Sequence, residues 1–250
     1  MSHELEWVYG IHACHALLNR HPERIVSAHA LKGRDDPKFT ELLNALSQLR
    51  IDCQVESRER LDELIQTQQH QGIALQCKPS QVFDKSYLNS LLKRADSDLL
   101  LLILDGVTDP HNLGACIRSA EAAGADAVII PKHKAASLSP VTRKVACGAA
   151  EIIPIVSVKN LAQCLSDLKD QGVWLYGAAG EASSSIYQTD LTGHVGLILG
   201  SEGDGLRQLT RSRCDVLINI PMAGHTSSLN VSVAAGVCLF EALRQRTAKR

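Results

Sequence analysis

The chain has 250 residues, of which 45% are hydrophobic and 21% charged, so it can bury the core of one large α/β domain or of two smaller ones. The absence of any run of about 18 apolar residues and of a secretory signal layout in Met1 to Arg20 predicts a cytoplasmic protein with no membrane partner. The net charge of −1 excludes binding of nucleic acid through bulk positive charge, because affinity rises with the number of phosphates neutralised.

The first part of the chain, residues 1–77, alternates short apolar strands with amphipathic helical segments. Strands are expected at Ile25–Leu31, Ile51–Val55 and Ile73–Cys77, and a helix at Phe39–Leu49. This alternation predicts a compact α/β domain of modest size.

A linker is expected at residues 78–97, where Lys-Pro-Ser-Gln breaks the strand and helix pattern. A short helix follows the break. Its leucines share one face, and Asp84 stands where a helix cap is expected.

Residues 98–250 are expected to form a second α/β domain. It begins with the apolar run Leu99–Leu104, which is typical of a strand covered on both faces. Further elements are expected as strands at Ala127–Ile130, Ile152–Val156, Val173–Gly177, Val195–Leu199 and Val216–Ile220, and as helices at Asn160–Gln171 and Val231–Arg246. Strands that alternate with helices predict a parallel sheet. The last helix is apolar nearly all round, which indicates burial in a core or in a subunit interface.

Residues 127–150 contain no carboxylate but four basic side chains, Lys132, Lys134, Arg143 and Lys144. This stretch is the best candidate for a phosphate-facing surface, and an ordinary solvated loop is the alternative. The eight cysteines stand singly, without a CxxC pair or zinc-finger spacing, so we expect reduced thiols and no metal.

Three loops rich in glycine and small polar residues follow predicted strands, at the edge where open α/β sheets bind ligands. They read DGVTDPHNLG from residue 105, GSEGDG from residue 200 and PMAGHTSSLN from residue 221. Because glycines let main-chain groups approach a ligand closely, these loops are suited to hold an adenine and a ribose. The motifs GxGxxG, Walker A and GxSxG are absent, which weakens the oxidoreductase and hydrolase alternatives.

The segments DGVTDPHNLGACIRSAEAAG, LILGSEGDGL and IPMAGHTSSLNVSVAAGVCLFEA resemble, in order and spacing, the three motifs of the SpoU (TrmH-type) RNA ribose methyltransferases of the SPOUT superfamily. The resemblance extends over nearly the whole chain, including VYGIHA near the N-terminus and HQGIA near Gly72. It implies a catalytic domain at residues 98–250 with a deep trefoil knot, and a ribosomal-protein-like RNA-binding domain at residues 1–77. It also implies a homodimer whose interface completes the active site. Periodicity alone predicts an unknotted sheet.

The activity that the resemblance implies is methyl transfer from S-adenosylmethionine to the ribose 2′-hydroxyl of a guanosine in the peptidyltransferase region of 23S rRNA. Relatives with the same motifs modify transfer RNA or other ribosomal nucleotides, so those targets stay open. A catalytically silent RNA-binding protein with the same fold is the alternative from another functional class.

By resemblance, Arg118 is the catalytic arginine. A guanidinium is in general a poor base, so we expect Arg118 to bind a phosphate and stabilise the forming alkoxide, while proton abstraction stays open. Asn112, Glu202, Ser228 and Asn230 match the other polar motif positions and are expected to orient the nucleotide, the arginine and the loops. Asn112 and Ser228 could instead satisfy loop backbone groups, and Asn230 could cap the last helix.

The resemblance assigns the adenosine of S-adenosylmethionine to main-chain groups and apolar side chains at Gly200, Ile220, Met222 and Leu229. Ile220 and Leu229 could also be core residues, because such a pocket is cut into the core.

RNA binding by residues 1–77 would need a local patch, because this part holds 8 Lys and Arg against 11 Asp and Glu. The candidate patch consists of Arg20, Arg24, Lys32 and Arg34, and scattered surface charge is the alternative.

Overall fold

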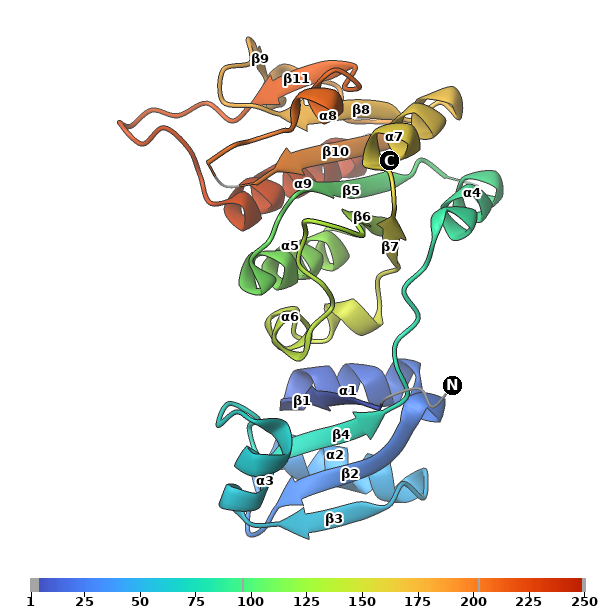
Figure 1. Cartoon of the computed structure of the whole chain (residues 1–250), viewed down its shortest axis with the longest axis vertical. Coiled ribbons are helices and arrows are strands. Elements are labelled where there is room, and N and C mark those ends of the chain that lie inside the picture. The colour runs from blue at the N-terminus through green and yellow to red at the C-terminus, as the bar shows by residue number, and fades with distance from the viewer. Residues whose placement is uncertain (1–4, 96, 202, 249–250) are drawn as a thin grey trace. The chain divides into compact units, whose positions relative to one another are not determined.

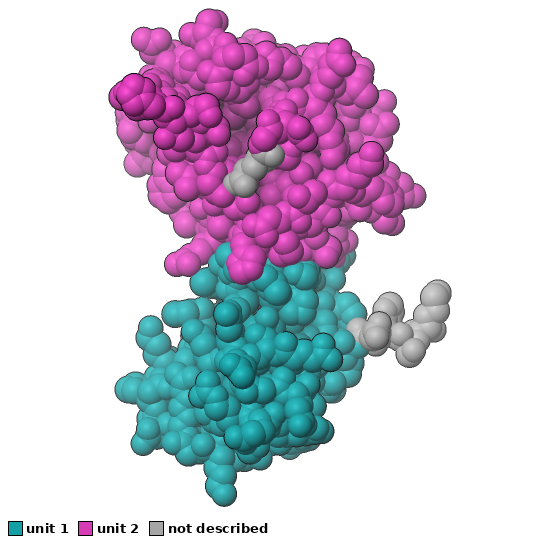
Figure 2. Space-filling model, turned by 60° about the vertical axis from the view of Figure 1, so that its left-hand side comes forward, with its two compact units in different colours: residues 1–81, 138–152 teal, residues 82–137, 153–250 magenta. Residues whose placement is uncertain are grey.

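The computed structural model describes residues 5–95, 97–201 and 203–248 and divides the chain into two compact units (Figure 1, Figure 2). Unit 1 comprises residues 1–81 and 138–152, and unit 2 comprises residues 82–137 and 153–250. The segment 138–152 therefore packs with the N-terminal unit, although the strand and helix pattern alone places it in the C-terminal domain.

Unit 1 contains a four-stranded sheet in the order β1-β4-β2-β3. Its strands are β1 (Glu6–Tyr9), β2 (Ile25–Leu31), β3 (Cys53–Glu56) and β4 (Ile73–Cys77). Its helices are α1 (Ile11–Arg20), η1 (Pro22–Arg24), α2 (Pro37–Gln48), α3 (Arg58–Ile65), α6 (Pro140–Val145) and η2 (Ala149–Glu151). Strand β4 pairs antiparallel with β1 and β2, whereas β2 and β3 are parallel.

Helix α2 shows how local sequence determines this unit. The Asp36 side chain accepts a hydrogen bond from the Phe39 amide at the start of the helix. Pro37 fits the first helical position because an amide hydrogen there would have no partner within the helix. Phe39, Leu42 and Leu46 then repeat at helical spacing and are completely buried. The predicted helix is confirmed, and it starts two residues earlier than expected because of this cap.

A buried cluster of ion pairs joins the segment 138–152 to β1 and η1 of unit 1. Arg143 on α6 pairs with Glu151 and with Glu6, and Arg24 pairs with Glu6 at 2.7 Å and with Glu151 at 2.6 Å. The side chains of Arg143 and Glu151 are 3% and 1% exposed, so each charge depends on its partners. The prediction that Arg143 faces phosphate is therefore wrong, because counting charges along a sequence does not reveal burial.

Unit 2 contains a seven-stranded sheet in the order β7-β6-β5-β10-β8-β11-β9. Its strands are β5 (Leu100–Asp105), β6 (Ala127–Pro131), β7 (Ile155–Val158), β8 (Trp174–Ala178), β9 (Ser184–Ser185), β10 (Val195–Gly200) and β11 (Val216–Asn219). Its helices are α4 (Lys85–Arg94), α5 (Pro110–Ala122), α7 (Leu161–Asp170), η3 (Ile186–Gln188), α8 (Gln208–Arg211) and α9 (Val231–Ala248). All pairs of neighbouring strands are parallel, as predicted.

Helices cover both faces of this sheet. All six residues of β5 are buried, which confirms the prediction from the apolar run. Leu101 and Ile103 share a buried cluster with residues of α4 and α7. Because successive side chains of a strand alternate between its faces, the other residues of β5 face the side of the sheet where α5 and α9 lie. Figure 1 shows this layer of two helices. The α/β fold class is thus established, and the trefoil knot stays a prediction.

Two local details of unit 2 are instructive. Asp84 caps α4 by accepting a hydrogen bond from the Ser86 amide, as expected. Strand β7 begins at Ile155 rather than at Ile152, because η2 precedes it and Pro154 lacks an amide donor for the sheet.

Across the described residues, no helix combines the length and the apolar character needed to cross a membrane.

Candidate functional site

The three glycine-containing loops follow strands β5, β10 and β11, and therefore lie along the carboxyl edge of the parallel sheet. Strand β10 is the direct neighbour of β5, and β8 separates β10 from β11. At a strand spacing of about 4.8 Å, the second and third loops begin about 10 Å apart. One ligand of nucleoside size can contact both loops.

The first loop leads into α5 through a helix cap. Asp109 accepts hydrogen bonds from the amides of His111 at 3.1 Å and of Asn112 at 3.3 Å. This cap fixes where α5 begins, and therefore where Asn112 and Arg118 lie on it. The Arg118 side chain is exposed, while Leu113 and Ile117 hold the opposite face of the helix in the core.

Asn230 connects the third loop with the first. Its Nδ2 donates a hydrogen bond to Oδ1 of Asn112 at 3.0 Å. Its Oδ1 accepts from the Ser232 amide at 2.9 Å and from the Ser232 hydroxyl at 2.6 Å, so it also caps α9. The expected cap is confirmed, and the Asn112 contact joins two motifs that lie more than a hundred residues apart in the sequence.

The second loop folds back on itself. The amide of Ser201 donates to the carbonyl of Gly205 at 3.1 Å, and the amide of Gly205 donates to the carbonyl of Ser201 at 3.0 Å. A Cβ atom at Gly200 would lie 2.0 Å from the Gly205 carbonyl group, so only glycine fits at this strand end. Glu202, expected among the polar site residues, lies outside the described residues.

A buried carboxylate that the sequence reasoning missed joins the first two loops. Asp105 is 0% exposed and accepts a hydrogen bond from the Arg207 amide at 3.0 Å. The Arg207 guanidinium lies 3.4 Å from the same carboxylate and donates to the Lys134 carbonyl at 3.3 Å. In the sequence, the sign of such a role for Asp105 was its position directly after a fully apolar run.

The third loop is the most open part of the site. Residues 221–228 are all exposed, and the Met222 side chain is 40% exposed. Ile220 and Leu229, on either side of this run, are partly buried. The structure therefore brings Asn112 and Asn230 into contact, and it leaves Met222 and Ser228 at the surface of the single chain.

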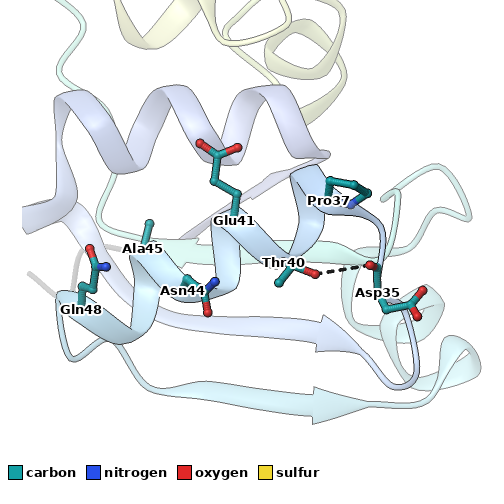
Figure 3. Close-up of a pocket in the computed structure, with 7 residues that line it drawn as sticks. All are labelled: Asp35, Pro37, Thr40, Glu41, Asn44, Ala45 and Gln48. Carbon is teal, nitrogen blue, oxygen red and sulfur yellow. Dashed lines mark hydrogen bonds between the residues drawn. The ribbon is translucent and has the colours of Figure 1, made fainter.

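The basic patch expected in residues 1–77 is only partly available. Arg24 is held in the buried ion-pair cluster, and Arg34 pairs with Asp36 and donates to the Gln71 carbonyl. Arg20 and Lys32 are exposed. A nearby hollow runs along α2 and is polar (Figure 3). It is lined by Asp35, Pro37, Thr40, Glu41, Asn44, Ala45 and Gln48, and its two carboxylates make it unsuited to phosphate.

Comparison with known proteins gives consistent results for both parts of the chain. Residues 99–240 match the SpoU rRNA Methylase family, and residues 7–83 match a family described as RNA 2′-O ribose methyltransferase substrate binding. The first match contains all three loops described above.

Two curated relatives are similar over nearly their whole length. The 23S rRNA (guanosine-2′-O-)-methyltransferase RlmB of Pseudomonas syringae pv. tomato is 53% identical over 247 residues, covering 99% of this chain and 98% of the relative. RlmB of Vibrio cholerae is 53% identical over 250 residues and covers 100% of both chains.

A solved structure has the same fold. The SpoU methyltransferase AviRb of Streptomyces viridochromogenes, crystallised with its cofactor AdoMet, superposes with a TM-score of 0.80 over 97% of this chain and 90% of its own. Its sequence is 24% identical, so this likeness concerns the fold.

Proposed function

The chain belongs to the SpoU rRNA methylase family, and from that premise we propose its reaction, its target and its working assembly. It is an S-adenosylmethionine-dependent methyltransferase that modifies the ribose 2′-hydroxyl of a guanosine in 23S rRNA. The observation that carries this assignment is the 53% identity to RlmB proteins over essentially the entire chain.

The residues at the carboxyl edge fit the cofactor. Main-chain groups of the tight loop after Gly200 are suited to bind the polar edges of an adenosine, and Ile220, Met222 and Leu229 supply apolar surface for its ring. When bound, S-adenosylmethionine supplies an electrophilic methyl group on a sulfonium.

Catalysis in this site depends mainly on positioning. Holding the ribose oxygen in line with the methyl group can lower the barrier by roughly 7 to 11 kcal/mol. We assign that positioning to the first and third loops, whose geometry is coupled through the hydrogen bond between Asn112 and Asn230.

Arg118 is the proposed catalytic residue. Its exposed side chain projects from α5, where a guanidinium can bind an RNA phosphate and stabilise the alkoxide that forms as the hydroxyl loses its proton. We assign charge stabilisation rather than proton abstraction to Arg118, because a guanidinium is in general a poor base.

The target is proposed to be a guanosine in the peptidyltransferase region of 23S rRNA, modified in the cytoplasm. The N-terminal residues are proposed to bind this RNA, with the match of residues 7–83 to a substrate-binding family as support. Arg20 and Lys32 are the exposed basic residues of unit 1 that remain from the sequence-based patch.

The working form is proposed to be a homodimer built on α9. One face of this helix packs on α5, whereas Val233 and Phe240 on its other side are 51% and 49% exposed. Exposed apolar side chains seven residues apart form one stripe on a helix, which a second copy would cover. A partner at this face would also lie beside the open third loop that precedes α9.

The test of the reaction is substitution of Arg118 by alanine. Single-turnover methyl transfer to 23S rRNA should fall by about a thousandfold, because an electrostatic contact to developing charge is lost. Cofactor affinity measured by calorimetry should stay within a few fold. Arg94→Ala, an exposed arginine on α4, is the matched control, and unchanged turnover in Arg118→Ala would refute the assigned role.

A further inference from the structure

Unit 2 has a hollow of about 570 Å³ at the same carboxyl edge, on the β7 side of the sheet. Its walls include Val82 and Phe83 from the segment before α4, Lys132 and Lys159 from the ends of two strands, and Gln163 from α7. The volume is within the range of pockets that bind small ligands.

The position of the hollow follows from the strand ends. Strands β6 and β7 end at Pro131 and Val158, so Lys132 and Lys159 are the first residues beyond them, and the Lys132 amide donates to the Val158 carbonyl at 2.8 Å. Phe83 extends the sheet beside β7, since its amide donates to Ile155 at 2.9 Å and its carbonyl accepts from Ser157 at 2.8 Å. An aromatic side chain and two lysines thus line one hollow.

Positive charge exceeds negative charge in the wall of this hollow. Lys85 pairs with Asp167, and Asp84, which caps α4, is the one carboxylate among the described residues that line it. Lys132 and Lys159 are exposed, and within the described residues neither forms an ion pair. The Phe83 ring packs against Tyr87 with its centroid 4.0 Å away, and its remaining surface is partly exposed beside the two lysines. Two ammonium groups beside such a ring match a nucleic acid strand, which offers phosphates and base faces together.

One loop of the hollow also contacts the first motif loop. The loop that begins at Lys132 continues to Ala136, whose amide donates to the Val107 carbonyl in the first motif loop at 2.8 Å. The same loop accepts a hydrogen bond from Arg207 through the Lys134 carbonyl. A strand of RNA whose target ribose lies at Arg118 would therefore find this hollow along the same sheet edge.

We infer that this hollow binds the RNA substrate beside the target nucleotide, with Lys132 and Lys159 on backbone phosphates and Phe83 against a base. This inference rests on the proposed function and adds a substrate-binding site on unit 2 to it. The two lysines are substrate-binding residues remote from the reacting atoms, so they set affinity for RNA rather than the rate of the chemical step.

The test uses the full chain with Lys132→Gln and Lys159→Gln combined, and a 23S rRNA fragment as the probe. The Kd for RNA should rise about tenfold at 0.1 M salt, and the slope of log Kd against log salt should fall by about 1.4, as expected for two lost contacts to single-stranded phosphates. The KM for RNA should rise equally, while kcat at saturating RNA and the Kd for S-adenosylmethionine should stay within twofold.

The matched control is Lys93→Gln combined with Arg94→Gln, which removes the same charge from exposed positions at the far end of α4. This control should keep the wild-type salt slope. The inference would be overturned by equal salt slopes for the two double variants, or by wild-type affinity in the variant that combines Lys132→Gln with Lys159→Gln. Neither result would affect the proposed methyl transfer reaction. Phe83→Leu should weaken RNA binding without changing the salt slope, and wild-type affinity in this variant would exclude the base contact. Absence of transfer by the wild-type chain would instead refute the proposed function.

Discussion

Asn230 uses the two polar atoms of its side chain for different purposes. Its oxygen caps α9, and its nitrogen donates to Asn112 across the site. An aspartate retains the acceptor and carries a negative charge that suits a helix N-terminus, but it cannot donate to Asn112. The two functions can therefore be separated by substitution.

Asn230→Asp should keep the free energy of unfolding within about 0.5 kcal/mol of the wild type, whereas Asn230→Ala should lower it by about 1 kcal/mol through loss of the cap. In both variants the rate of methyl transfer should fall about tenfold, because a neutral hydrogen bond worth about 1.4 kcal/mol is lost. Urea denaturation and single-turnover assays measure the two effects. Full turnover in Asn230→Asp would show that the Asn112 contact does not contribute.

At the residue scale, local roles were predictable and distant contacts were not. An asparagine just before an apolar helix is a recognisable cap, so the role of Asn230 could be expected. The pairing of Asp105 with Arg207 depends on which strands become neighbours, and a sequence pattern contains no such information. Arg143 was misinterpreted because its burial depends on Glu6 and Arg24, which lie far away in the sequence, as well as on the nearby Glu151.

At the scale of elements, the last turns of α9 are attached to the amino edge of the sheet, opposite the carboxyl edge that carries the site. Arg246 donates to the carbonyls of Asp98, Leu99, Leu191 and Gly193, four bonds that only a guanidinium fork can make together. Burial lowers the pKa of Arg246 below its ordinary value, although the group stays charged at neutral pH. These bonds tie the C-terminal helix to the residues just before β5 and to the segment before β10.

Arg246→Lys should therefore lower the free energy of unfolding by about 1 kcal/mol, because the three donors of a lysine cannot replace four bonds, three of which are part-buried. Arg244→Lys is the control, since the Arg244 side chain is 65% exposed and its ion pair is screened by water, so this variant should lose much less stability. Urea unfolding measures both variants. Equal losses in the two would contradict the anchoring role of Arg246.

Element types were more predictable than element boundaries or order. Apolar runs located β5, β6 and β10, because strands covered on both faces have little choice of residue. The sheet order, in which β10 lies between β5 and β8, is set by long crossovers that leave no periodic signal. The grouping of 138–152 with unit 1 depends on buried ion pairs and was equally invisible.

At the scale of the whole molecule, the proposed dimer accounts for the apolar character of α9. A charged residue at Phe240 would be desolvated at a covered interface, whereas at the surface of a monomer it would be harmless. Leucine at the same position keeps the apolar surface.

Phe240→Glu should therefore sediment as a monomer where the wild type and Phe240→Leu sediment as dimers. Methyl transfer should fall at least tenfold in Phe240→Glu if the partner covers the third loop, and the thermal midpoint should fall because folding and association are linked. Analytical ultracentrifugation at several protein concentrations checks the assembly. A monomeric wild type would rule out the interface.

The central claim is that this chain methylates a guanosine ribose of 23S rRNA. Mapping of 2′-O-methyl groups in ribosomal and transfer RNA from cells that lack this protein, and from the same cells complemented with the wild type or with Arg118→Ala, tests it most directly. We predict that one guanosine in the peptidyltransferase region loses its methyl group and regains it only with the wild type. An unchanged 23S rRNA, or a methyl group lost from a transfer RNA instead, would contradict the claim.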